Sequence, residues 1–486
     1  METIPTELID LIVEAVPFHD LHSLALTCRR LLKCSIPALY NTIVINTSGS
    51  ASSPALGNDN ARRREKVKNL CRTIVERPDL AKHIKTLQMR YLEFEYYGAN
   101  INQREQTLFM KALDSLPLHP KDRKSWQEAI PISSESNFEA IVSLLVTQCV
   151  SLEKLSIAMS YIREYSWLWK VMKRSTAVRV FPQMHTVRVV SVNDSHEQAA
   201  RHVINYFRTL PKVQQIILLH VSTDDLRKDS NRDLEPIYPL VATKPGASNL
   251  PALVISKTSP ATKYELPEYL TLTWNLRTFV LHLMCPAQDY LPFELERMQT
   301  GLENVRSTLN HLAFRIDICD SPQGKASEVT DVCTGSLSFF RGYTALTTLE
   351  TSLPLLFGEP KTTNQQGHHL AEVLPPNLQK LIIADDLWHV IMFVWTTTVW
   401  TMDVFKEFFS GERLSDSSKY IDMDEAVVWS KAGQGTWKYA TPDLREFVFD
   451  IRTHVELSDY WDEEVVRKEL RRTCEKQGIK CRVLCE

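Results

Sequence analysis

The sequence predicts an α/β fold in which a small module of three helices precedes an irregular solenoid of short parallel strands. Two patterns predict it: helical spacing of apolar residues over positions 1–40, and a short apolar pattern that returns from residue 84 onward. The length of 486 residues also exceeds what one compact core of ordinary size holds. We therefore expect a stacked array of units and not one central core.

The repeated pattern has the form apolar-x-x-apolar-x-apolar, as in Ile84, Leu87 and Met89. Its last two apolar positions are two residues apart, which places both on one face of a strand. One strand with its connecting segment cannot bury its own apolar face, so neighbouring units must stack. The middle positions of the copies are Leu87, Leu155, Val187, Ile216, Leu253, Phe279, Leu312, Leu349, Leu381 and Phe447.

The spacing of these copies is nearly regular. Seven of the nine steps between successive middle positions are 26 to 37 residues long. The steps from Leu87 to Leu155 and from Leu381 to Phe447 are about twice that length. We therefore expect each long step to contain one further unit whose pattern has drifted beyond recognition.

A doubly wound α/β enzyme is the alternative fold, because it also alternates strands and helices. Such an enzyme usually carries a Gly-rich phosphate loop after a strand. The chain has 14 glycines, and the densest stretch, Gly433-Gln434-Gly435, has neither the spacing nor the following lysine. Neither G-x-S-x-G nor H-E-x-x-H occurs. We expect no catalytic residues and no cofactor.

Charge and hydropathy argue against two classes of partner. The 56 basic and 59 acidic residues give a net charge of -3, whereas a general nucleic-acid binder needs a basic surface. The best candidate for a membrane span covers only positions 390–402. A bilayer span needs about 20 residues, so we interpret this shorter stretch as buried core.

Cysteine usage and the first residues bear on the compartment. Glu2, Glu7 and Asp10 occupy the first ten positions, where a secretory signal has basic residues before an apolar run. The ten cysteines form no C-x-x-C pair, which favours a reducing compartment, the cytoplasm or the nucleus. The spacing of Cys474, Cys481 and Cys485 near the end matches no standard zinc site, and no histidine lies nearby, so we expect no metal.

A polar loop near residue 433 lies between two tryptophans, Trp429 and Trp437. Tryptophan is enriched at binding hot spots, but it also packs into cores. The pattern leaves both interpretations open for this pair.

Three short helices fit positions 1–40. Pro5 suits a first helical turn, where its missing N–H is no loss. Asp20 is the expected N-cap of the second helix, and Pro37 is expected to open the third. A segment of this length can bury few apolar side chains in a core of its own. We therefore expect the remaining ones to be covered by a neighbouring domain or by a partner. The apolar face expected on the first helix consists of Leu8, Leu11, Ile12, Ala15 and Val16.

This N-terminal segment, positions 1–40, resembles an F-box. The family's pattern has Leu-Pro, then Glu and aliphatic residues on a helix, then Asp-Leu, then a Cys-like step followed by basic residues. Leu32 stands where many members carry Trp. The remainder is similar to the divergent leucine-rich arrays of fungal F-box proteins, most visibly at positions 346–358 and 374–387. The matching positions are Ile4-Pro5, Glu7, Leu8, Ile12, Asp20-Leu21, Leu24 and Thr27-Cys28-Arg29-Arg30.

The resemblance implies a substrate-recognition adaptor of an SCF-type cullin–RING ubiquitin ligase. The F-box of that family binds a Skp-type adaptor and through it a cullin, while the repeats hold the protein to be ubiquitinated. Catalysis belongs to other subunits. An F-box protein that acts outside ubiquitin ligases is the alternative within the same class. The residues expected to contact the adaptor are Ile4, Pro5, Leu8, Ile12, Leu21, Leu24, Leu32 and Leu39.

Three parts are expected along the chain: an F-box over residues 1–45, a flexible loop over 46–60, and a solenoid with a C-terminal capping region over 61–486. In a solenoid, the side chains that alternate with the buried strand positions face the concave surface. The alternative is that loops cover the aliphatic members of this face. The residues expected to contact the substrate protein are Arg188, His282, Arg315 and Glu350.

Overall fold

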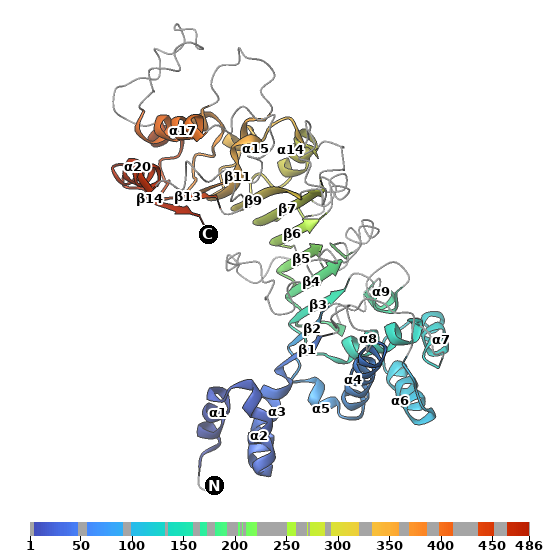
Figure 1. Cartoon of the computed structure of the whole chain (residues 1–486). Helices are drawn as coiled ribbons and strands as arrows, with labels where there is room; N and C mark the ends of the chain where they lie inside the picture. Colours follow the sequence, from blue (N-terminus) through green and yellow to red (C-terminus); the bar gives the residue numbers. More distant parts are fainter. Residues whose placement is uncertain are drawn as a thin grey trace. The chain divides into compact units, whose positions relative to one another are not determined.

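The computed structural model places the chain in an α/β fold (Figure 1). By its contacts the chain divides into two compact units, Met1–Leu250 and Pro251–Glu486, and each is described by itself. The structure describes residues 4–46, 56–90, 99–131, 135–158, 166–172, 180–191, 203–204, 207, 210–220, 250–258, 270, 273–286, 293–319, 333–358, 369–385, 398–411, 436–451 and 464–485.

Unit 1 begins with the helices α1 (Thr6–Ala15), α2 (Phe18–Thr27) and α3 (Arg29–Asn41). Pro5 directly precedes α1, as expected for a helix start. Two finer expectations are wrong. Pro17, and not Asp20, precedes α2, and Pro37 lies inside α3. The module closes on a small core made of Ile9, Val13, Leu21 and Leu31.

Both units are built from short parallel strands that pair in the order of the sequence, as the apolar repeat predicted. In unit 1 the strands are β1 (Thr42–Asn46), β2 (Thr86–Arg90), β3 (Lys154–Ala158), β4 (Thr186–Ser191) and β5 (Gln215–His220). In unit 2 they are β6 (Ala252–Thr258), β7 (Thr278–Pro286), β9 (His311–Cys319), β11 (Thr348–Ser352), β12 (Lys380–Ala384), β13 (Glu446–Asp450) and β14 (Lys480–Leu484). The strands β8 (Phe293–Glu294) and β10 (Cys333–Thr334) form a separate pair.

The corner before each strand fixes the register between units. The carbonyl of Lys85 accepts hydrogen bonds from the backbone N–H groups of Glu153 and Lys154, at 2.7 and 2.9 Å. In unit 2, the carbonyl of Arg277 accepts hydrogen bonds from the backbone N–H groups of Asn310 and His311 in the same way, at 2.8 and 2.9 Å. One backbone carbonyl thus accepts from two backbone N–H groups of the following unit, so these N–H groups need no side chain as a partner. This explains why the repeat needs no fixed corner residue.

Every position of the apolar pattern is buried, and within each unit the middle positions lie opposite one another. Leu87 pairs with Leu155 in unit 1, and Leu381 pairs with Phe447 in unit 2. The predicted strand register is therefore confirmed. Only the weakest copy places a polar side chain, Thr351, in the core, where its hydroxyl has no hydrogen-bond partner.

The expectation of drifted units in the two long steps is wrong. β2 pairs directly with β3, and β12 pairs directly with β13. The first step instead contains the helices α6 (Gln103–Asp114), α7 (Pro120–Ala129) and α8 (Glu135–Gln148), and the described part of the second contains α17 (Thr398–Ser410). Long steps here are insertions between adjacent strands.

Apart from the separate pair β8 and β10, two strands escaped the pattern, β1 and β14. β1 follows α3 without a break, and Tyr40 stands where other copies have a small or aliphatic apolar residue. In β14 the corresponding positions are Gly478, which has a φ of 77°, and Cys481. Neither copy has the leucine-like first position on which recognition depended.

The remaining helices complete the two units. α4 starts at Leu56, so positions 56–60 of the expected 46–60 loop are helical, and positions 47–55 lie outside the described residues. Among the described helices, none combines the length and the apolar character needed to cross a bilayer. These helices are α4 (Leu56–Glu76), α5 (Pro78–Ala81), α9 (Trp167–Met172), α14 (Leu295–Glu303), α15 (Leu353–Phe357), α16 (Leu370–Val373), α18 (Trp437–Ala440) and α20 (Glu464–Glu475).

Candidate docking surfaces and polar networks

The N-terminal helices leave large apolar side chains uncovered. In α1, Ile9 and Val13 turn into the core of the module, so the positions beside them point away from it. Leu8, Leu11 and Ile12 are 51%, 59% and 46% exposed. An uncovered apolar row of this kind on a helix is typical of an interaction site.

The other two helices add to this surface. Phe18 and Leu26 of α2 and Leu32 of α3 are also exposed. We call the six side chains of the module the N-terminal apolar surface, and they are Leu8, Leu11, Ile12, Phe18, Leu26 and Leu32.

The predicted adaptor contacts divide into three groups. Pro5, Leu8, Ile12 and Leu32 are exposed. Leu21 is buried in the core of the module, so it stabilises the helices and is not accessible to a partner. Sequence reasoning left Leu11, Phe18 and Leu26 off the contact list, although Leu11 belonged to the expected helical face. The half-buried group, which packs on the module's core, is Ile4, Leu24 and Leu39.

Polar contacts hold the start of the module in place. The guanidinium of Arg30 donates hydrogen bonds to the carbonyl of Ile4 and to the Thr6 hydroxyl. Cys28 precedes α3, and a hydrogen bond from the backbone N–H of Leu31 lowers the pKa of its thiol. The two Arg30 contacts join the start of α1 to α3, which keeps the first helix folded against the third.

In unit 2, the face of the strands opposite the apolar pattern carries a buried ion network. The Nε of Arg315 donates to Glu350, and its Nη2 lies 2.7 Å from Asp450 Oδ2. The side chains of Glu350 and Asp450 are only 6% and 3% exposed. Ala384 of β12 pairs with Asp450 of β13 on one side and with Ser352 of β11 on the other. These two small side chains lie between Arg315 and Asp450 on this face of the strands.

This network changes the interpretation of the predicted substrate contacts. The strand register was right, but Glu350 is buried and bound to Arg315, so it is not a free surface group. Arg188 and His282 are half-buried. The aliphatic members of the same face, such as Ile217 and Val280, are buried. The larger part of this face therefore stabilises the array and is not an open binding surface.

His311 lies beside this network and is almost completely buried. Burial lowers the pKa of its imidazole, Glu350 opposes that shift, and the positive charge of Lys380 adds to it. Its Nε2 has no hydrogen-bond partner among the described residues. His311 is therefore neutral near pH 7.

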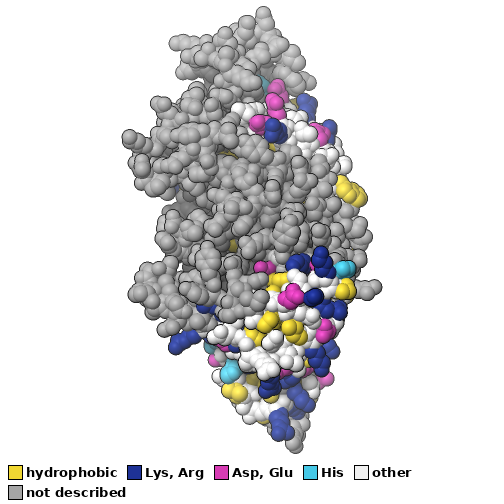
Figure 2. All heavy atoms as spheres, turned by 90° about the vertical axis from the view of Figure 1, so that its right-hand side faces the viewer, with side chains coloured by type: hydrophobic (Ala, Val, Ile, Leu, Met, Phe, Trp, Pro, Cys, Tyr) yellow, Lys and Arg dark blue, Asp and Glu magenta, His cyan; other side chains and the backbone are white. Residues whose placement is uncertain are grey.

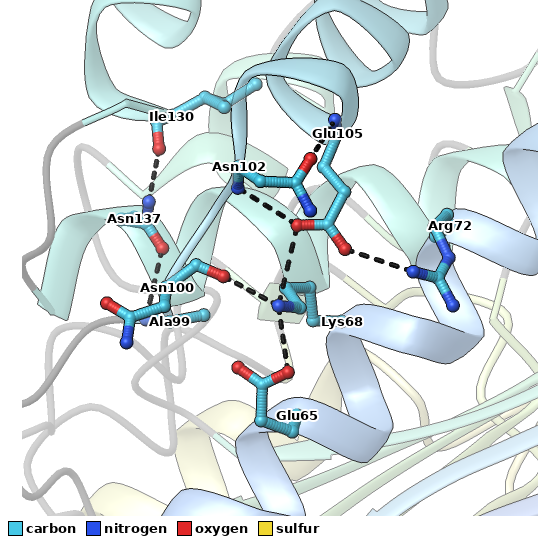
Figure 3. A network of polar contacts seen from close by, with 9 residues as sticks. All are labelled: Glu65, Lys68, Arg72, Ala99, Asn100, Asn102, Glu105, Ile130 and Asn137. Atoms are coloured by element: carbon cyan, nitrogen blue, oxygen red, sulfur yellow. Dashed lines mark hydrogen bonds and ion pairs between the residues drawn. The ribbon is translucent and has the colours of Figure 1, made fainter.

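A second buried network holds the helical insertion of unit 1 (Figure 3). Lys68 of α4 reaches Glu65 at 2.8 Å, the carbonyl of Asn100 at 2.6 Å and Glu105 at 3.5 Å. Glu105 also accepts from Arg72 at 3.3 Å and from the Asn102 backbone N–H at 3.1 Å. It thereby forms a capping box at the start of α6.

Through the contacts of Lys68, Arg72 and Glu105, this network joins α4 to α6. Figure 2 views the molecule from the side on which α6 and α7 lie in Figure 1. It shows Lys and Arg side chains over the described surface in its lower half, with hydrophobic and acidic ones among them. We interpret that mixture as an ordinary solvated surface.

The other singled-out residues have structural surroundings. Cys474 is fully buried, and a hydrogen bond with Cys481 together with burial raises the pKa of its thiol. Trp437 is buried, and Trp429 lies outside the described residues. Among the described residues, no three His, Cys, Asp or Glu side chains gather as metal ligands.

Comparison with known proteins adds no assignment. No protein-family model matches the chain, and a search of curated proteins finds no match. The functional interpretation therefore depends on the surfaces described above and on the F-box resemblance of positions 1–40.

Proposed function

We propose that the chain is a substrate-recognition adaptor of an SCF-type cullin–RING ubiquitin ligase. The observation that carries the proposal is the N-terminal apolar surface. It lies on the same three helices whose sequence resembles an F-box. A Skp-type adaptor that covers this surface would remove six large apolar side chains from water, which is a strong drive to associate.

The strand arrays support the second half of the proposal. Within each unit, parallel strands are stacked in sequence order, and stacked arrays of this kind present extended surfaces to proteins. The chain would bring a bound protein near the catalytic subunits and would perform no chemistry itself. Its contribution is proximity, which turns an encounter between two proteins into a reaction within one complex.

Co-purification with a Skp-type adaptor tests this proposal. The double variant Leu8→Asp/Ile12→Asp places two charges on the apolar surface and should abolish capture of the adaptor. The matched control is Val150→Asp/Val465→Asp, which makes the same change at exposed apolar positions outside the module. The control should retain the adaptor, and equal capture by all three proteins would refute the docking site.

The cullin provides a second readout in the same experiment. Recovery of the cullin with the wild-type chain is expected of a ligase subunit. Recovery of the Skp-type adaptor without the cullin would instead favour an F-box protein that acts outside ubiquitin ligases.

A further inference from the structure

The last three strands of unit 2 carry an exposed basic group on the face opposite the apolar pattern. Phe447 of β13 packs against Phe405 and Phe409 of α17, with ring centroids 5.0 Å apart in each case. The alternate positions of β12, β13 and β14 therefore point away from that helix. Those positions include Lys380, Glu446, Lys480 and Arg482.

Three cations of this group surround one carboxylate. Lys380 Nζ lies 3.6 Å from Glu446 Oε2, and Arg482 Nη2 pairs with Glu446 Oε1. Lys480 lies directly opposite Glu446 in the strand register, and its side chain is exposed. One negative charge cannot neutralise three positive ones, so these four described side chains carry an excess of two positive charges.

The neighbouring acids do not cancel that excess. Glu350 and Asp450 lie on the same face but are buried and bound to Arg315. Their two negative charges share the one guanidinium of Arg315, so together they offset at most one of the two excess positive charges. The exposed end of the face is thus basic although the whole chain has a net charge of -3.

Apolar side chains lie among these cations. Ile382 of β12 and Leu484 of β14 are partly exposed on the same face. Interfaces between proteins combine such partly exposed aliphatic groups with charged groups of complementary sign. A nucleic acid fits less well, because Glu446 lies in the middle of the group and three cations neutralise few phosphates.

From this arrangement we propose that the β12–β14 face binds an acidic, extended segment of the substrate protein. The inference rests on the proposed function, because it names the kind of segment that the array would receive. Lys380, Lys480 and Arg482 would attract the acidic side chains, and Glu446 would hold Lys380 and Arg482 in place. Ile382 and Leu484 would contact an aliphatic side chain of the segment.

Fluorescence anisotropy with a labelled Asp-rich peptide that contains one Leu tests the inference on the full chain. A peptide with Asn in place of each Asp is the uncharged comparison. The wild-type chain should bind the acidic peptide, and added salt should weaken binding because exposed charges are screened. Binding of the Asn peptide with equal affinity would contradict a charge-dependent site.

The decisive variants reverse two exposed charges. Lys480→Glu/Arg482→Glu should weaken binding of the acidic peptide at least about tenfold, since it turns attraction into repulsion. The matched control Lys468→Glu/Arg472→Glu makes the same charge change on α20 and should bind as the wild type does. The milder Lys480→Gln/Arg482→Gln variant gives a second test if the charge reversal disturbs folding.

Three results would overturn the inference. They are no binding by the wild-type chain, equal loss in the α20 control, and preferential binding of a single-stranded DNA of equal charge. Capture of the Skp-type adaptor by the same proteins is measured in parallel. Intact adaptor capture without peptide binding would refute this inference alone, whereas loss of adaptor capture by the wild type would refute the proposed function.

Discussion

The N-terminal helices and the strand arrays treat apolar residues in opposite ways. In the arrays, every apolar position of the repeat is buried. In the module, four residues form the core while six large apolar side chains remain exposed. Stability alone does not explain the second pattern, because exposed apolar side chains add nothing to the folded state. The arrays thus bury their apolar residues in folding, and the exposed ones of the module are the reason for proposing that it associates with a partner.

The two buried ion networks differ in a similar way. The one in unit 1 is built around the first turn of α6, where Glu105 is also held by a backbone N–H group. The one in unit 2 depends on one guanidinium that joins strands from distant parts of the sequence. Removing Arg315 in unit 2 should therefore lower the free energy of unfolding more than removing Lys68 in unit 1.

The largest effect is expected where an array loses a core ring. Phe447→Ala removes a fully buried side chain that packs against Phe405 and Phe409. It should lower the free energy of unfolding by about 3–5 kcal/mol. Urea unfolding followed by circular dichroism measures it. A loss no greater than that of the exposed-site variant Ile12→Ala would contradict the contrast between array and module.

A somewhat smaller effect is expected for Arg315→Met, which leaves Glu350 and Asp450 buried without their cation. Breaking a buried pair costs about 3–5 kcal/mol, and we expect the lower end because Arg315 is buried incompletely. Changing the acids as well, with Glu350→Gln/Asp450→Asn, should restore part of the loss. If the triple variant is less stable than Arg315→Met alone, the two carboxylates do not need the guanidinium to be stable when buried, which would contradict this interpretation.

Lys68→Met should lower the free energy of unfolding by a smaller amount, about 1–3 kcal/mol. Glu105 keeps Arg72 and the Asn102 N–H as partners, whereas the acids around Arg315 lose their central cation. The same unfolding measurement compares the two variants directly. A larger loss for Lys68→Met than for Arg315→Met would reverse the ranking of the two networks.

The smallest effect is a dependence of stability on pH through His311. Burial holds its pKa in the folded protein below the ordinary value of 6.5, so the unfolded chain binds the proton more readily. The neutral imidazole makes its full contribution to the free energy of unfolding above pH 6.5. That contribution is lost as the pH falls from 6.5 through the pKa of His311 in the folded protein. His311→Asn should flatten the pH profile of the unfolding midpoint below 6.5, and an unchanged slope would refute the assignment.

Much of the fold was predictable because strand register depends on local alternation. Leu87, Leu381 and their counterparts show that alternation in the sequence, and the structure buries them all. The insertions were not predictable from spacing, since a long step looks the same whether it holds a drifted strand or helices. The last strand was missed because Gly478 and Cys481 lack the leucine pattern.

The candidate sites were less predictable than the fold. Helical spacing identified Leu8 and Ile12, but it could not show that Ile9 and Val13 would form the inner face. Alternation placed Arg315 and Glu350 on the correct side of the strands. It could not show that Asp450, far along the chain, would join them and remove Glu350 from the surface.

Titration calorimetry with a purified Skp-type adaptor tests the central claim most directly, because it reports affinity and heat-capacity change together. The account predicts binding with a negative heat-capacity change, the mark of apolar surface leaving water. It also predicts no detectable binding for Leu8→Asp/Ile12→Asp and full binding for Val150→Asp/Val465→Asp. No binding by the wild-type chain, or unchanged binding by the Leu8/Ile12 variant, would contradict the assignment of the N-terminal apolar surface as a docking site.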